Sequence, residues 1–159
     1  MLTGGPPACT SYPRGEVTVR GADVDADLQP MLDRVAAAQA ALFAGDSAPY
    51  TACWAPSDDV TLFGAFGTRE KGHRRVTDTF AWVASRFSDG EMVAAYDTVE
   101  VCGDLAYTVG FERGTVRVDD GEPGPMTIRV THIYKRIDGD WYLVHRHGDH
   151  PPPDPRLAP

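Results

Sequence analysis

The chain has 159 residues, of which 42% are hydrophobic, and this size and composition suit one compact domain with a single core. Its formal net charge of −8 argues against a nucleic-acid or anionic-membrane partner, because both partners require a basic protein surface. No apolar run of about 18 residues occurs, so the sequence predicts no membrane-spanning helix.

The three cysteines, Cys9, Cys53 and Cys102, are widely spaced and form no CxxC motif. An odd number of scattered cysteines is typical of reduced thiols rather than of a disulfide framework. The N-terminal residues MLTGGPPACTSYPRG also lack the basic start and apolar segment of a secretory signal. We therefore expect a cytoplasmic protein.

The chain divides into three parts. Residues 1–24 mix glycine, proline and arginine without periodicity and predict a flexible arm. Residues 151–159 have the sequence PPPDPRLAP and predict an extended proline-rich tail. Residues 25–150 remain for the folded domain.

Helical spacing marks the first half of that domain. A first helix is expected from Leu28 to Ala44, with Asp27 as its cap, and a short second helix is expected from Ser47 to a point before Pro56. A third helix is expected after Gly72. Ser88-Asp89-Gly90 is expected to end this helix. Its apolar positions follow helical spacing and are Val76, Phe80, Val83 and Phe87.

The pattern then alternates with a period of two. The expected strands are Val60 to Phe63, before the third helix, and Met92 to Cys102, Leu105 to Val118, Met126 to Ile137 and Trp141 to His147 after it. Helices followed by an antiparallel meander predict an α+β fold in which a curved sheet wraps around about three helices.

Four of the five histidines fall in the last segment, RVTHIYKRIDGDWYLVHRHGDH. If Asp138-Gly139 forms a two-residue turn, His132 lies opposite His145. One sheet face then holds the apolar and histidine side chains and is expected to face the helices: Val130, His132, Tyr134, Trp141, Leu143, His145 and His147.

The segments FGTREKGHRRV and RVTHIYKRIDGDWYLVHRHGD, in this order of elements, resemble the nuclear transport factor 2-like superfamily. Within it the chain is similar to SnoaL-like and ketosteroid-isomerase-like proteins and to the calcium/calmodulin-dependent kinase II association domain. The resemblance spans about residues 28–150 and implies a cone-shaped domain, the cystatin-like α+β roll. It also implies a small-molecule pocket between sheet and helices, and a homodimer formed through the sheet.

The same resemblance bears on single positions. His132 matches a pocket arginine of the kinase association domain, and Glu112 matches another. An imidazole and an acid thus stand where that domain has cations. The aspartate and tyrosine that serve the isomerases cannot be placed on this sequence.

We expect His132 and Glu112 to be the catalytic residues of a site for proton transfer, with Glu112 orienting His132. The alternative is that His132 and His145 form a structural cross-strand pair. The remaining expected pocket residues are Tyr50, Trp54, Phe63, Tyr134, His145, His147 and Asp149. His145-x-His147 with His132, and Asp149 or Glu112, also allows a metal site, although we expect no metal and no cofactor.

The predicted function is therefore that of a SnoaL-like pocket protein. Its ligand would be a small hydrophobic molecule, and its chemistry would be of the isomerase, cyclase, dehydratase or hydrolase type. The alternative is a non-catalytic ligand-binding or oligomerisation module.

Overall fold

The computed structural model describes residues 26–152, so the expected arm, residues 1–24, and the tail from residue 153 lie outside the described residues. The described part contains the helices α1 (Gln29–Phe43), α2 (Ala48–Thr51) and α3 (His73–Ala84). Its strands are β1 (Thr61–Phe63), β2 (Arg69–Lys71), β3 (Phe87–Cys102), β4 (Leu105–Val118), β5 (Gly124–Ile137) and β6 (Asp140–Asp149). No described helix is long and apolar enough to cross a membrane.

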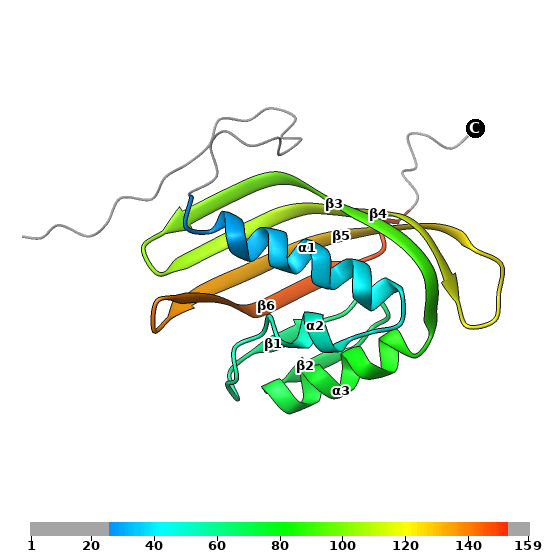
Figure 1. Cartoon of the computed structure of the whole chain (residues 1–159), viewed down its shortest axis with the longest axis horizontal. Coiled ribbons are helices and arrows are strands. Elements are labelled where there is room, and N and C mark those ends of the chain that lie inside the picture. Colours follow the sequence, from blue (N-terminus) through cyan, green and yellow to red (C-terminus); the bar gives the residue numbers. More distant parts are fainter. Residues whose placement is uncertain (1–25, 153–159) are drawn as a thin grey trace, which may run out of the picture.

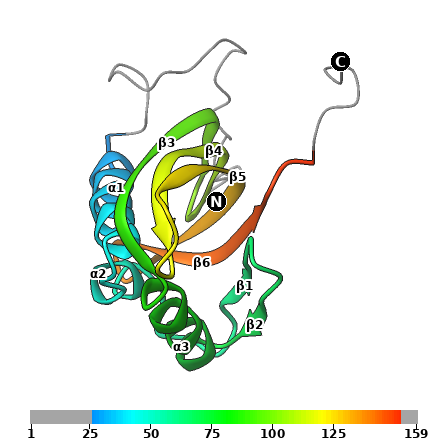
Figure 2. The ribbon, with the colours of Figure 1, turned by 90° about the vertical axis from the view of Figure 1, so that its right-hand side faces the viewer.

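The six strands form one curved sheet in the order β2-β1-β6-β5-β4-β3 (Figure 1). Strands β3 to β6 form the expected antiparallel meander, and β1 joins it by pairing in parallel with β6. The sequence pattern does not predict β2, because its residues are charged and show no apolar alternation. Two views show α1 beside β3, and α2 and α3 lie beyond the C-terminal end of α1 (Figures 1 and 2). The predicted α+β fold is confirmed.

Helix α1 supplies much of the core because its apolar residues recur at helical spacing. Met31, Leu32, Val35 and Leu42 are buried against the sheet, and Gln39 is buried with them. Leu28 rather than Asp27 is the residue before the first turn, and it makes no side-chain capping hydrogen bond. The helix ends where Gly45 adopts a φ of 100°, as the glycine at this position predicts.

The predicted end of the third helix is wrong. Helix α3 ends at Ala84, and Phe87 begins β3 instead of continuing the helix. Phe87 stacks on Phe43 with ring centroids 5.2 Å apart, so its apolar side chain is buried from a strand. The pairing of β3 with β4 shifts between Ser88 and Glu91, which places the expected helix-ending residues in a bulge of the strand.

The predicted register of the last hairpin is correct only near its turn. Ile137 pairs with Asp140 and Tyr134 with Leu143, but a bulge follows, and His132 then lies opposite Arg146 rather than His145. Because β6 has one extra residue here, the alternation of faces is inverted beyond it. We call the sheet side that carries Thr108, Glu112, His132 and Arg146 the helix face, and the opposite side the outer face.

Two of the cysteines are among the described residues. Cys53 is a buried free thiol. Cys102 is disulfide-bonded, so the expectation of reduced thiols is wrong for this residue.

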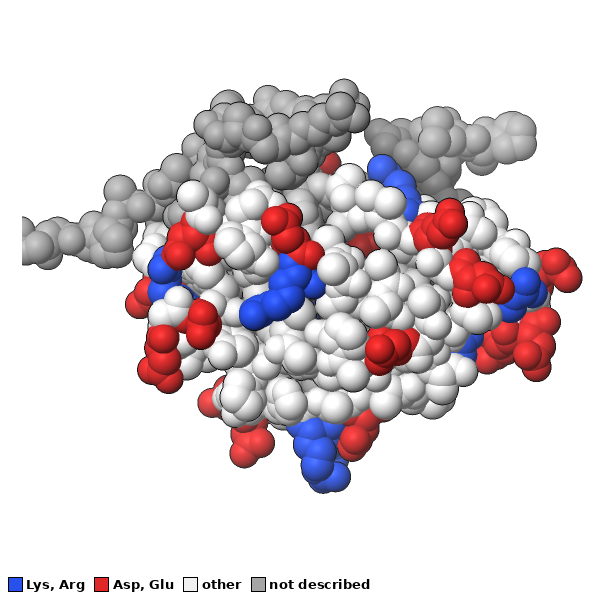
Figure 3. All heavy atoms as spheres, viewed as in Figure 1, with Lys and Arg blue, Asp and Glu red and all other residues white. Residues whose placement is uncertain are grey.

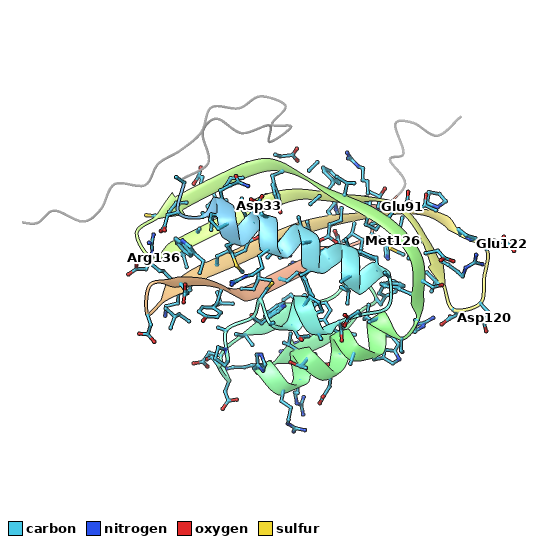
Figure 4. The ribbon with its side chains drawn as sticks, viewed as in Figure 1. Asp33, Glu91, Asp120, Glu122, Met126 and Arg136 are labelled. Carbon is cyan, nitrogen blue, oxygen red and sulfur yellow. The ribbon has the colours of Figure 1, made fainter. Side chains whose placement is uncertain are left out.

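The acidic character of the chain is visible at its surface. Figure 3 shows acidic side chains at both ends of the face, and Figure 4 places Asp120 and Glu122 at one of these ends, in the connection between β4 and β5. On the face shown, basic side chains are scattered rather than gathered in one patch (Figure 3).

Candidate functional site

Five polar or charged side chains are buried in the described part of the chain, and all five belong to α1 or to the helix face of the sheet. Their exposed fractions are small: Gln39 5%, Thr108 1%, Glu112 1%, His132 1% and Arg146 6%. Burial of polar groups is costly unless they find partners, so such a cluster indicates either a hydrogen-bonded core network or a site.

Glu112 is at the centre of the first part of this cluster. Nη2 of Arg146 donates a hydrogen bond to its Oε2 across 2.7 Å, and Nε2 of Gln39 donates to its Oε1. Both carboxylate oxygens therefore already have partners, one from β6 and one from α1. Burial acts to lower the pKa of Arg146, but Glu112 and Tyr50 outweigh it, so the pKa of Arg146 is raised and the guanidinium stays charged.

The backbone around this ion pair is shaped by glycines. A Cβ atom on Gly148 would lie 2.5 Å from Nη1 of Arg146, so the guanidinium occupies the space of the missing side chain. Gly110 and Gly114, which flank Glu112, face the β3 backbone: added Cβ atoms would lie 2.0 Å from the Ala95 carbonyl oxygen and 1.8 Å from that of Glu91. These two glycines thus allow β3 to bend closely over Glu112.

His132 is the second centre of the cluster. Its Nε2 lies 3.1 Å from the hydroxyl of Tyr50 on α2. Burial first, and then the charge of Arg146, hold the pKa of His132 well below 6.5, so the imidazole is neutral at neutral pH. Burial likewise raises the pKa of Tyr50, which stays a neutral phenol. The pair is therefore an uncharged imidazole held by an uncharged hydroxyl.

Several buried polar atoms near His132 make no well-aligned hydrogen bond with residues 26–152. These atoms include Nδ1 of His132, Oγ1 of Thr108 and the hydroxyl of Tyr134. Thr108 pairs with His132 across the sheet, and Tyr134 follows His132 on the same face of β5. Acceptors and donors of three side chains thus meet in one buried region without satisfying their full hydrogen-bonding capacity.

An apolar pocket reaches the same cluster from the side of α3. Its walls come from the end of α1, from α3 and from the β1–β2 turn, and Arg146 also lines it. The space open to water inside is about 30 Å³, enough for at least one water molecule. Arg146 therefore borders both the apolar pocket and, through its pairing with His132, the buried polar cluster.

The structure brings only some of the predicted site residues together. Tyr50, Tyr134, His132 and Glu112 are buried on the helix side, and Trp54 is buried beside Phe80. Glu112 and His132 do not contact each other directly: the first binds Arg146 and Gln39, the second Tyr50. Their catalytic roles stay predictions.

The other predicted pocket residues lie on the outer face. Phe63 is 40% exposed and packs edge-on against the rings of His145 and His147. Nδ1 of His145 lies 2.7 Å from the Thr61 hydroxyl, and Asp149 accepts two hydrogen bonds from Arg129. The bulge in β6 separates these side chains from His132, so the histidine trio considered for a metal is not assembled. The described residues contain no group of three or more metal-ligating side chains arranged to hold an ion.

Sequence reasoning missed Arg146 and Gln39. Strict alternation along the last strand predicts that Arg146 lies on the side opposite to His145 and Leu143, whereas the bulge in β6 places it on the helix face. Gln39 had a detectable signal, because it occupies an apolar position of α1 by its spacing from Val35 and Leu42.

Comparison with known proteins assigns the family. The SnoaL-like domain family matches residues 32–152. The chain therefore belongs to the SnoaL-like family. Among curated proteins, none matches the chain.

Solved structures support the same fold. A candidate calcium/calmodulin-dependent protein kinase II association domain from Xanthomonas campestris has a TM-score of 0.67 at 18% identity, covering 90% of this chain and 99% of that one. A ketosteroid isomerase-like protein from Erwinia carotovora atroseptica has a TM-score of 0.68 at 16% identity, and the match covers 82% of this chain and 100% of that one. A candidate dehydratase of the nuclear transport factor 2-like family from Streptomyces avermitilis has a TM-score of 0.63 at 16% identity, and the match covers 79% of this chain and 94% of that one. At these identities the likeness shows the fold alone.

Proposed function

We propose that this SnoaL-like domain binds a small, mostly hydrophobic molecule between its sheet and helices, and that His132 transfers a proton on it. One observation carries the proposal. Nδ1 of His132, a neutral buried imidazole, has no partner within the described residues, while the other ring nitrogen is held by Tyr50. Buried ring nitrogens normally find a partner, so a free one beside other unpartnered polar atoms marks a place for a ligand.

The Tyr50 hydrogen bond determines what Nδ1 does. If Nε2–H of His132 donates to the Tyr50 hydroxyl, Nδ1 carries a lone pair and acts as a base. If the hydroxyl donates to Nε2, Nδ1 carries the proton and acts as a donor to a substrate oxygen. Isomerisation, cyclisation, dehydration and ring opening each need one or both of these proton transfers. Glu112 is paired with Arg146 near His132, so its carboxylate is not available as a base.

Exchange of ketone α-protons in deuterated buffer tests the proposal without knowledge of the natural substrate. We expect the protein to accelerate deuterium incorporation into butanone, measured by proton nuclear magnetic resonance, and His132→Gln to abolish the acceleration. His150→Gln is the matched control, because His150 is exposed and bonds the Thr127 carbonyl. Equal rates for wild type and His132→Gln would contradict the role of His132.

A non-catalytic binding module is the second candidate. Both carboxylate oxygens of Glu112 are occupied, which leaves no free carboxylate to orient His132. In this case ketones would bind without faster exchange, and the same experiment separates the two functions when binding is followed in parallel.

We further propose that the domain forms a homodimer through its outer face. Val93, Leu105 and Val109 are 71%, 49% and 37% exposed there. Strand alternation places Phe111 beside them, on the side opposite to Glu112. Apolar side chains gathered on one sheet face are typical of surfaces that a partner covers.

A further inference from the structure

The apolar pocket ends at a buried cation. Its walls are hydrophobic, with Leu62, Ala65, Phe66, Phe80, Val83 and Phe87 among them, and Arg146 is the only charged residue that lines it within the described part of the chain. A buried guanidinium at the end of an apolar pocket would ordinarily favour an anionic ligand, because the ligand would neutralise it.

This cation is already neutralised from within. The carboxylate of Glu112 is bound to Nη2 of Arg146, and Gln39 holds the other carboxylate oxygen in place. His132, opposite Arg146 on β5, is uncharged, so it adds no second positive charge. The inner end of the pocket is therefore electrically balanced before any ligand enters.

One hydrogen-bond donor of Arg146 remains unused. Its Nε makes no hydrogen bond with residues 26–152, although the side chain is only 7% exposed. An uncharged ligand with an acceptor oxygen, such as a ketone, could use this donor without disturbing the ion pair. A carboxylate would add an uncompensated negative charge or would have to displace Glu112, and both are strongly unfavourable in a buried site.

We propose that Glu112 determines the charge selectivity of the pocket: as a fixed counter-ion of Arg146, it makes the pocket select uncharged ligands that carry a hydrogen-bond acceptor and reject carboxylates. This inference rests on the proposed small-molecule function. It predicts that removing the charge of Glu112 converts the pocket into a carboxylate site, because Arg146 then lacks a counter-ion.

Two pairs of probes of matched shape test the selectivity. Acetone and acetate differ in charge but hardly in shape, and butanone and propanoate repeat the comparison at a slightly larger size. We would measure dissociation constants at pH 7.5 from chemical-shift titrations of the nitrogen-15-labelled full-length chain. The wild type should bind each ketone at least tenfold more tightly than its carboxylate, and Glu112→Gln should reverse this preference by at least tenfold.

The double variant Glu112→Gln/Arg146→Gln is the matched control. With both charges removed the pocket is again neutral, so it should still reject the carboxylates. If Glu112→Gln does not fold alone, propanoate should restore its fold by neutralising Arg146, and a failure of propanoate to do so at any concentration overturns the proposal.

The possible failures are distinguishable. A wild type that binds carboxylates as tightly as ketones, or a folded Glu112→Gln that keeps the wild-type preference, overturns the selectivity proposal and leaves the proposed pocket intact. If no probe binds the wild type or either variant, the small-molecule function is overturned as well.

Discussion

Arg146 and Glu112 form an ion pair beneath the helices, with Nη2 of the arginine 2.7 Å from Oε2 of the glutamate. The side chains are 7% and 2% exposed, so water does not screen their charges. The pair connects β6 with β4, and Gln39 extends it to α1. It therefore joins the two layers of the domain at the position where the apolar pocket ends.

Removing one member of this pair should destabilise the fold strongly. Glu112→Ala leaves the buried charge of Arg146 without a partner, and we expect a loss of about 3–5 kcal/mol in the free energy of unfolding, measured by urea denaturation. The matched control is Asp149→Ala, which breaks the exposed pair with Arg129 and should cost about 0–1 kcal/mol. Equal losses for the two variants would contradict the burial of the Glu112 pair.

The space beneath Arg146 should not admit a methyl group. A Cβ on residue 148 would lie 2.5 Å from Nη1 of Arg146, so Gly148→Ala must displace the guanidinium, and we expect a cost of about 1–3 kcal/mol. Gly124→Ala is the control, because no atom lies within 4 Å of its added Cβ, and its unfolding free energy should change by less than about 0.5 kcal/mol. An unchanged midpoint for Gly148→Ala would show that Arg146 lies elsewhere.

His132 should make stability depend on pH. Its folded-state pKa is lowered well below 6.5 by burial and by Arg146, so between 6.5 and that lower value the unfolded chain binds a proton that the folded chain does not. Stability from this residue is therefore fully present above pH 6.5 and falls as the pH decreases, by up to about 1.4 kcal/mol per pH unit.

Urea denaturation from pH 7.5 to 5.0 checks this sign. We expect His132→Gln to remove about one proton from the slope. His145 contributes in the same direction, since burial also lowers its pKa. Identical slopes for the wild type and His132→Gln would show that the imidazole titrates equally in both states.

The outer face should control association. We expect a dimer at micromolar concentration by light scattering, and Val109→Asp, which places a charge among the exposed apolar residues, should shift the species toward the monomer. Val83→Asp would be a poor comparison, because Val83 lines the pocket. Asp78→Asn is the control, because Asp78 is exposed on α3 and not on the sheet, and it should keep the wild-type mass. A wild-type monomer would contradict the dimer proposal.

Periodicity predicted most of the fold because most elements bury one regular face. The spacing of Leu32, Val35 and Leu42 defines α1, and strict alternation defines β4. The sequence failed where one residue interrupts a period. The extra residue in β6 exchanged the faces of Arg146 and His145, and the bulge after Ser88 turned an expected helix end into strand.

The candidate site was predicted less completely for the same reason. His132 lies on β5 and Glu112 on β4, and the extra residue of the bulge belongs to β6. Alternation therefore predicts the correct face for both residues. Arg146 follows the bulge, so strict alternation predicts the wrong face for it. An ion pair between residues 34 positions apart requires the register to be known, and alternation alone could not supply it.

The most direct measurement of the central claim is a nitrogen-15 spectrum of the histidine rings, with and without butanone. We predict that His132 stays a neutral imidazole as the pH falls below 6.5, and that its ring signals move when butanone is added while those of His150 do not. A His132 that titrates near pH 6.5, or whose signals ignore the ketone at every concentration, would contradict a buried neutral imidazole in a ligand site.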